Sequence, residues 1–234
     1  MGDAFAATEE ILEDPETTDA ALSRSIQSVL PVTGVSVSTV GELLGSETIS
    51  ASDELAERID MLQFDLGEGP CWDAHRTGQR ILVGDLAALP ASRWPLFVEA
   101  IRADGVHSIF AFPIVFGPFR LGAVDLYATR PVTLDDETTG RAQVFSDIIG
   151  RRIIRNATHG ADDTTTRPFS RRTIHQATGI VIAQLGLTAK DAYLLIQGHA
   201  FAQHRSMLEV SDDLLTGRLH FTRGSDGIAA RERT

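Results

Sequence analysis

The chain has 234 residues, enough for one or two domains, and a formal net charge of −11. It shows no apolar run near the roughly 20 residues that span a bilayer, and no basic and apolar leader, so we expect a cytoplasmic protein without a membrane segment. The single cysteine, Cys71, excludes an internal disulfide framework and a cysteine-rich zinc site.

The charge is divided unevenly along the chain. Residues 1–166 carry 12 arginines against 26 acidic residues, a net charge of −14, whereas residues 167–223 carry seven basic and four acidic residues, a net charge of +3. An acidic surface repels phosphate, so the sequence disfavours nucleic-acid binding by the first part and leaves 167–223 as the region for it. Two copies would double the phosphate contacts, which favours a homodimer.

Residues 20–155 alternate between helical and extended patterns. We predict helices over about 20–30, 54–62, 70–75, 93–103 and 134–155, and strands over about 34–40, 48–51, 81–85, 106–116 and 120–128. This order is an α+β pattern, a sheet with flanking helices. The segment before it, 1–19, is acidic and poor in large apolar residues, which predicts a mobile acidic tail.

Short motifs follow one another in this region. They are Gly67-Glu68-Gly69-Pro70 at a helix start, Val83-Gly84-Asp85, Gly105-Val106 before the long strand, Pro113 within it, and Leu121-Gly122-Ala123 in the return strand. In this order they resemble the GAF domain, a sensor family. The resemblance implies that 20–155 form a six-stranded antiparallel sheet with flanking helices, and that a small ligand lies between the sheet and its covering loops.

The resemblance also suggests which residues line that ligand pocket. The expected lining is Asp85, Trp94, Phe110, Phe112 and Ile114. Aromatic and aliphatic side chains at strand spacing are also ordinary core residues, so the alternative is a packed interior without a pocket. The sequence does not identify the ligand.

Cys71 lies near the start of a predicted helix, where a thiolate is stabilised. The alternative, which we favour, is a small buried apolar residue. The seven histidines show no spacing typical of zinc sites, and no Ser-His-Asp motif, P-loop or dinucleotide fingerprint occurs. We therefore expect no metal, no cofactor and no enzymatic activity.

Residues 156–166 are polar and rich in turn formers, which predicts a linker. Behind it, residues 170–221 predict three short helices. Apolar residues at helical spacing mark the first helix, Gly186 ends it, Thr188 with Asp191 begins the second, and Ser206 with Glu209 forms a capping box for the third. We expect a small three-helix bundle over 167–223, followed by a tail over 224–234.

This bundle resembles the ANTAR domain, an RNA-binding unit of bacterial antitermination regulators. The residues that carry the resemblance are Arg171, Ile174, Ala177 and Gly179, then Thr188, Ala192, Ile196 and Ala200, and the close over 210–221. It implies binding to paired RNA hairpins with short loops in leader transcripts. The expected RNA contacts are Arg171, Arg172, His175, Lys190, Gln197, Arg205 and Arg218. Gln197 stands where the family usually has arginine.

The domain order resembles the GAF–ANTAR regulators of actinobacteria. It implies an RNA-binding transcription antitermination regulator in which the GAF domain senses a small-molecule ligand or an upstream signalling protein and controls the ANTAR domain. The alternative is a ligand-sensing or protein-interaction module whose ANTAR unit serves dimerisation.

Overall fold

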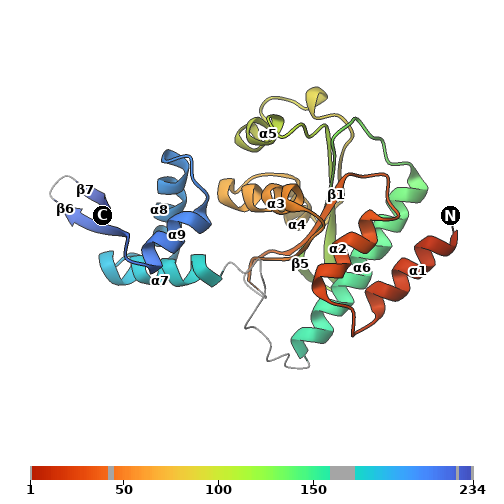
Figure 1. The fold of residues 1–234 in the computed structure, drawn as a ribbon, viewed down its shortest axis with the longest axis horizontal. Coiled ribbons are helices and arrows are strands. Elements are labelled where there is room, and N and C mark those ends of the chain that lie inside the picture. Colours follow the sequence, from red (N-terminus) through yellow and green to blue (C-terminus); the bar gives the residue numbers. More distant parts are fainter. Residues whose placement is uncertain (1, 42–44, 159–171, 225–226, 233–234) are drawn as a thin grey trace. The chain divides into compact units, whose positions relative to one another are not determined.

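The computed structural model describes residues 2–41, 45–158, 172–224 and 227–232. The chain divides into two compact units, Met1–Phe169 and Ser170–Thr234 (Figure 1). Among the described residues no single helix is long and apolar enough to cross a membrane, and one strongly bent pair, Thr173–Leu185 with Ala189–Ala202, passes that test by length and composition only.

The first unit is built on an antiparallel sheet of strand order β2-β1-β5-β4-β3. Its strands are β1 (Gly34–Thr39), β2 (Glu47–Ala51), β3 (Ile81–Val83), β4 (Ser108–Phe116) and β5 (Phe119–Ala128). These are the five strands that the residue pattern predicts, whereas the GAF resemblance implied a sixth, which the described part of the unit does not contain. Gly122 allows β5 to approach β1, since a Cβ there would lie 1.9 Å from the Ser38 carbonyl oxygen.

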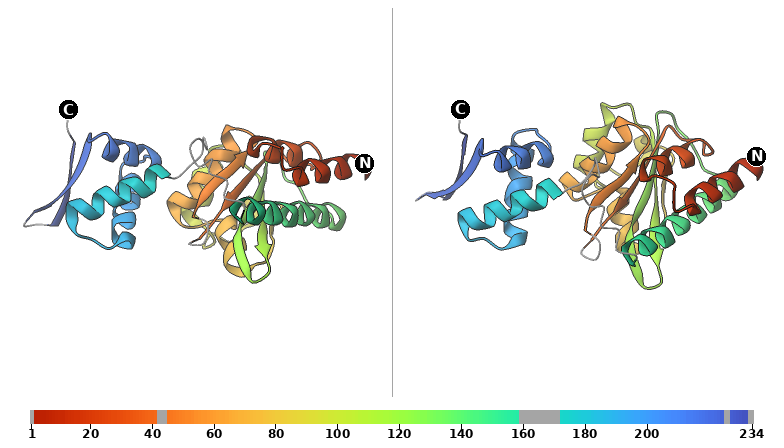
Figure 2. Two further views of the ribbon diagram at one scale, coloured as in Figure 1. Left: turned by 90° about the horizontal axis from the view of Figure 1, so that it is seen from below. Right: turned by 60° about the horizontal axis from the view of Figure 1, so that its bottom comes forward.

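One face of the sheet is covered by α1 (Gly2–Glu13), α2 (Asp19–Gln27) and α6 (Asp136–Thr158) (Figures 1 and 2). The prediction of a mobile tail over 1–19 is wrong, because α1 is an ordered helix that packs on α6. Phe5 and Leu12, one stripe of α1, are buried in the core, and the Phe5 ring stacks on Phe145 at 6.0 Å. Phe5 and Leu12 are seven residues apart, so they lie on the same side of α1 and bury that side although the segment is acidic.

The other face carries α3 (Glu54–Leu66), α4 (Pro70–Thr77), the short 3₁₀ helix η1 (Leu86–Ala88) and α5 (Pro95–Arg102). The Gly-Glu-Gly-Pro motif forms the turn between α3 and α4. Gly67 caps α3 with φ of 67° and Gly69 precedes α4 with φ of 134°, values that favour glycine. The predicted helix start at Pro70 is confirmed, and Gly78 caps the C-terminus of α4 with φ of 68°.

The second unit contains α7 (Arg172–Leu185), α8 (Ala189–Ala202) and α9 (Met207–Leu215) around one apolar core. The predicted caps are present: the Thr188 hydroxyl accepts from the Asp191 amide, and Ser206 and Glu209 form a reciprocal capping box. The predicted linker 156–166 begins within α6, which continues to Thr158, and its remainder lies outside the described residues.

The bundle continues into a hairpin of β6 (Leu219–Gly224) and β7 (Gly227–Glu232), where the sequence indicated the end of the bundle and a tail. The hairpin forms because Leu219 and Phe221 bury their side chains in the helical core while His220, between them, is exposed. The Phe221 amide also donates to the side-chain oxygen of Gln184 on α7 at 3.0 Å. Buried and exposed side chains thus alternate along β6, which is the pattern of a strand with one face on a core.

Candidate functional site

The two faces of the central sheet differ in chemistry. The face toward α6 is apolar: Val35, Phe110 and Leu126 lie in one cross-strand row of it, and Val37, Phe112 and Val124 lie in the next. The opposite face, under α4, pairs Ser36 with Asp125 and Ala111, and Ser38 with Ala123 and Pro113. Small and polar residues in the middle of a buried sheet leave room and hydrogen-bonding groups beneath α3 and α4.

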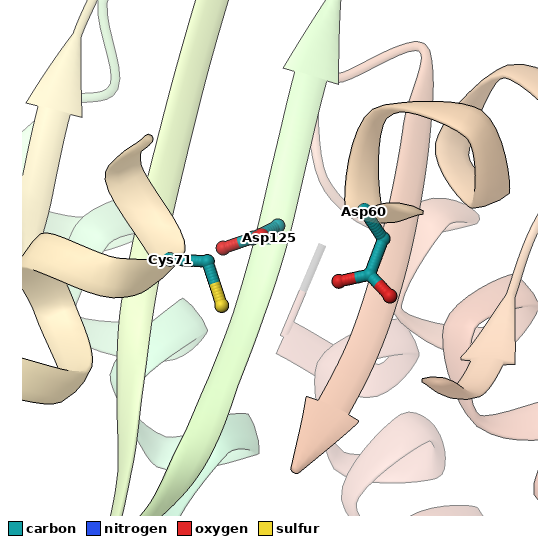
Figure 3. A group of neighbouring side chains, drawn as sticks. All are labelled: Asp60, Cys71 and Asp125. Atoms are coloured by element: carbon teal, nitrogen blue, oxygen red, sulfur yellow. The ribbon is translucent and has the colours of Figure 1, made fainter. Parts of the chain in front are cut away.

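A buried cluster of two carboxyl groups and one thiol occupies this space. Asp60 comes from α3, Cys71 from α4 and Asp125 from β5, and one potential ligand atom of each lies within 4.8 Å of the other two (Figure 3). None of the three side chains is more than 3% exposed. The favoured interpretation of Cys71 as a buried residue agrees with this position.

Gln63 on α3 connects the elements that supply the cluster. Its side-chain nitrogen Nε2 donates to Asp125 Oδ2 at 2.6 Å, and its oxygen Oε1 accepts from the Cys71 amide at 2.7 Å. A Cβ at Gly69 would lie 2.6 Å from that oxygen, so glycine is needed where the chain passes Gln63. Thr48 on β2 donates a hydrogen bond to Asp60 Oδ2, and the Ser38 hydroxyl lies 3.8 Å from the Cys71 sulfur.

Burial dominates the electrostatics of the cluster. It raises the pKa of Asp125 well above the usual value, and the nearby Asp60 carboxyl raises that pKa further, whereas hydrogen bonds from Gln63 and Cys71 oppose the rise. In the described part of the chain, Asp125 Oδ1 is buried and no N–H or O–H group donates to it, so beyond Gln63 the carboxyl group has only the weakly donating Cys71 thiol. The site therefore holds a polar atom that a proton or a cation would satisfy.

The five residues expected to line a ligand pocket do not come together. Phe110, Phe112 and Ile114 lie in the apolar core on the α6 side of the sheet, and Trp94 lies in a separate core cluster on the other side. Asp85 is exposed, and its carboxylate caps η1 by accepting from the Ala87 amide at 2.9 Å. Even-numbered residues of β4 point away from the polar face, so the strand places three of the five expected residues on the opposite side of the sheet from Trp94.

Sequence reasoning missed Asp60, Gln63 and Asp125. One signal was available, because Asp125 is a charged residue inside the apolar strand that contains Val124 and Leu126. A charge in the middle of a buried strand requires a partner or a function. Its neighbours Gln63 and Cys71, however, are 62 and 54 residues away in the sequence. Only the docking of α3 and α4 brings them to Asp125.

The second unit distributes its predicted RNA contacts unequally. His175 on α7 and Lys190 on α8 are exposed. Arg205 and Arg218 both form ion pairs with Asp213, each at 2.6 Å, and Arg218 also pairs with Asp212 at 2.7 Å. Arg171 lies outside the described residues, and of Arg172 only the backbone, the first turn of α7, is described. Two of the expected phosphate contacts are thus held by carboxylates of the same unit.

An exposed stripe runs along α8. It consists of Lys190, Leu194, Gln197 and Phe201, which follow one another at spacings of four, three and four residues and so share one side of the helix. Leu194 is 49% exposed and Phe201 54% exposed, while Gln197 is half-buried. The α8 stripe, as we call these four residues, combines a cation, an amide and two exposed apolar side chains.

Comparisons with known proteins divide the chain in two. The family model for the GAF domain matches residues 15–153, and that for the ANTAR domain matches residues 162–215. No curated protein sequence matches the chain. Both families are typically sensory and regulatory rather than catalytic.

Solved structures of similar fold include GAF domains of two phosphoenolpyruvate-protein phosphotransferases. The one from Coxiella burnetii is 14% identical with a TM-score of 0.52, and the match covers 68% of this chain and 95% of that chain. The one from Acinetobacter is 9% identical with a TM-score of 0.50, and the match covers 69% and 96%. At these identities the likeness shows the fold alone.

Proposed function

Because this chain belongs to the GAF domain family and carries an ANTAR domain behind its GAF domain, we propose that it is an RNA-binding transcription antitermination regulator controlled by its GAF sensor domain. ANTAR domains are RNA-binding modules, and GAF domains bind small ligands or proteins. The observation that carries the proposal is the ANTAR match over 162–215, which overlaps the basic region 167–223.

The α8 stripe is the proposed RNA surface. Lys190 offers a contact to phosphate, and the exposed ring of Phe201 offers a platform on which an unpaired loop base stacks. Gln197, between them, presents an amide that donates and accepts hydrogen bonds at base edges. Arg205 and Arg218 contribute phosphate contacts only when their ion pairs with Asp213 open.

We propose that two chains act together on leader transcripts with two short-loop hairpins. One bundle presents a single described lysine and one free aromatic ring on the α8 stripe, so a homodimer doubles a small set of contacts. The signal is a small molecule or a signalling protein received by the GAF domain. The long helix α6, which packs on β4, leads along the chain toward the ANTAR domain and supplies a covalent route for that signal.

The test measures binding of the full chain to a two-hairpin RNA by fluorescence anisotropy across a salt series. The double variant K190A/F201A removes one charge and one stacking ring, and we expect a loss of affinity of about tenfold or more, because stacking alone contributes about 1–3 kcal/mol per base. The matched control is R102A/L96A, which removes an exposed arginine and an exposed leucine from α5. Equal affinities of both double variants would refute the assignment of the α8 stripe.

The exposed Leu194 and Phe201 also favour a second function, a protein-interaction module whose ANTAR unit serves dimerisation. The variant Q197R separates the two. If the stripe binds RNA, an added cation there raises RNA affinity. If the stripe is a dimer interface, the added charge weakens self-association in sedimentation equilibrium and leaves RNA binding unchanged.

A further inference from the structure

We propose that Asp60, Cys71 and Asp125 form a binding site for a divalent transition-metal ion in the GAF domain, with Zn²⁺ the ion that suits the donor set best. The proposal stands whether or not the ANTAR domain binds RNA. It also revises the expectation of no metal site, which rested on the single cysteine and on the spacing of the histidines.

The three donors converge from separate elements on one buried point. One carboxylate oxygen of Asp60, the sulfur of Cys71 and one carboxylate oxygen of Asp125 lie within 4.8 Å of one another, beneath α3 and α4. Figure 3 shows the carboxyl group of Asp125 directed toward Cys71, with Asp60 across β5 from them. Such convergence is costly without a ligand, because each group loses its hydration.

Asp125 provides a second and separate indication of a ligand. The residue is 97% buried, Oδ2 accepts from Gln63, and no N–H or O–H group of the described residues donates to the buried Oδ1, so the weakly donating Cys71 thiol is the other donor to this carboxyl group. No lysine, arginine or histidine of the described ranges forms an ion pair with this carboxyl group. A buried carboxylate oxygen without a strong donor is destabilising, and a bound cation would offset that cost.

The surrounding groups are arranged as the outer shell of a metal site. Gln63 fixes one oxygen of Asp125 and also accepts from the Cys71 amide, while Thr48 donates to one oxygen of Asp60. In metal sites, hydrogen bonds of this kind orient carboxylate ligands and leave the second oxygen for the ion. The hydrogen bond from Gln63 keeps the Asp125 carboxyl group in one orientation.

The donor types select among ions. A thiolate with two carboxylates suits Zn²⁺, which accepts sulfur and oxygen, whereas Mg²⁺ and Ca²⁺ bind through oxygen alone. Zinc bonds of about 2.0–2.3 Å place tetrahedral donors roughly 3.3–3.7 Å apart, so donors that lie within 4.8 Å of one another need only small shifts to bind the ion. Three protein donors leave a fourth position for water or an added ligand, as in open zinc sites.

The experiment uses the untagged full chain, freed of metal by chelation and then dialysed against Zn²⁺ or Co²⁺. Bound metal is counted by mass spectrometry, and the cobalt form is scanned for a thiolate-to-cobalt charge-transfer band. We expect one equivalent of metal per chain and that band. D125N should lower the affinity at least tenfold, C71S should remove the band, and D85N, at an exposed carboxylate, should change neither.

Circular dichroism of each variant without metal verifies that it is folded. If D125N does not fold, C71S decides the question, since it removes only the sulfur from a buried position. The proposal is overturned if the unaltered chain binds no stoichiometric metal. It is equally overturned if bound Zn²⁺ persists unchanged in folded D125N and C71S, because the seven histidines would then hold it elsewhere.

Discussion

The two units of this protein place their unusual side chains in opposite environments. The GAF unit buries carboxyl groups, those of Asp60 and Asp125, under helices that exclude water. The ANTAR unit instead exposes apolar side chains, those of Leu194 and Phe201, along one side of α8. Each arrangement costs free energy in an isolated chain, so each marks the place where a ligand or partner is expected. The two proposals follow this contrast, with a metal ion enclosed in the first unit and RNA bound on the surface of the second.

The largest effect should come from the apolar face of the sheet, whose side chains form the main core of the GAF unit. Phe112 is fully buried there, and F112A should lower the free energy of unfolding by about 3–5 kcal/mol. Denaturant unfolding of the full chain measures it. F116A, on the same strand with a 40% exposed ring, is the control and should cost far less. Equal losses would show that this face is not the tightly packed one.

The polar face should respond more weakly, through hydrogen bonds. Q63M keeps the size of the side chain but leaves the Cys71 amide and Asp125 Oδ2 without their partner, so we expect a loss of about 2–4 kcal/mol. The control is Q143M on α6, whose amide hydrogen bonds reach Asp147 at 3.0 Å in a more exposed place. A Q63M protein as stable as Q143M would contradict the organising role of Gln63.

In the ANTAR unit, helix caps should contribute more than any buried polar group. S206A removes the hydroxyl that accepts from the Glu209 amide and leaves the Ser206 amide to donate to Glu209 Oε2, so it should cost about 1 kcal/mol in the unfolding of that unit. Hydrogen exchange of the α9 amides reports the change locally. S92A, at an exposed serine of the GAF unit, should leave those amides unaffected. Unchanged exchange in S206A would show that packing alone holds α9.

The smallest effect is a pH dependence carried by His199 on α8. Burial lowers the pKa of His199 most, the charge of Arg205 lowers it further, and the charge of Glu232 opposes both effects. The His199 ring contacts the Phe221 ring edge-on, with the ring centres 5.3 Å apart. The unfolded chain therefore binds a proton more readily, and the ANTAR unit should lose stability as the pH falls below about 6.5. H199Q should flatten that dependence, and H220Q, at an exposed histidine, should not. If H199Q loses stability more steeply than the unaltered chain as the pH falls, the predicted destabilisation by protonation of His199 is wrong.

The sequence predicted what depends on neighbours along the chain. The caps at Thr188 and Ser206 and the five strands of the GAF sheet are local patterns, and the structure contains them. The helix α1 escaped prediction because its acidic composition concealed the spacing of Phe5 and Leu12. The β6–β7 hairpin was not predicted either, because the sequence pattern assigns its first strand to the end of the helical bundle and its second strand to a tail.

The candidate sites depend on contacts that sequence spacing does not reveal. The cluster of Asp60, Cys71 and Asp125 needs α3 and α4 to dock on one chosen face of β5. The pairing of Arg205 and Arg218 with Asp213 spans eight and five residues across the turns that flank α9. Arg205 and Arg218 are thus partly neutralised by carboxylates in the fold, which the sequence does not reveal. Asp125 in an apolar strand can be recognised as part of a site only when Asp60 and Cys71 are placed beside it.

The central claim is that the ANTAR unit binds RNA through its cations, and the salt dependence of binding by the full chain and by D213N tests it most directly. In the unaltered chain, affinity for a two-hairpin RNA should fall as salt rises. D213N removes the carboxylate that Arg205 and Arg218 share, which frees Arg205 and leaves Arg218 its pair with Asp212, so the variant should bind more tightly at low salt, with a salt slope steeper by about one. Binding that is absent, or that is indifferent to salt in both proteins, would contradict the claim.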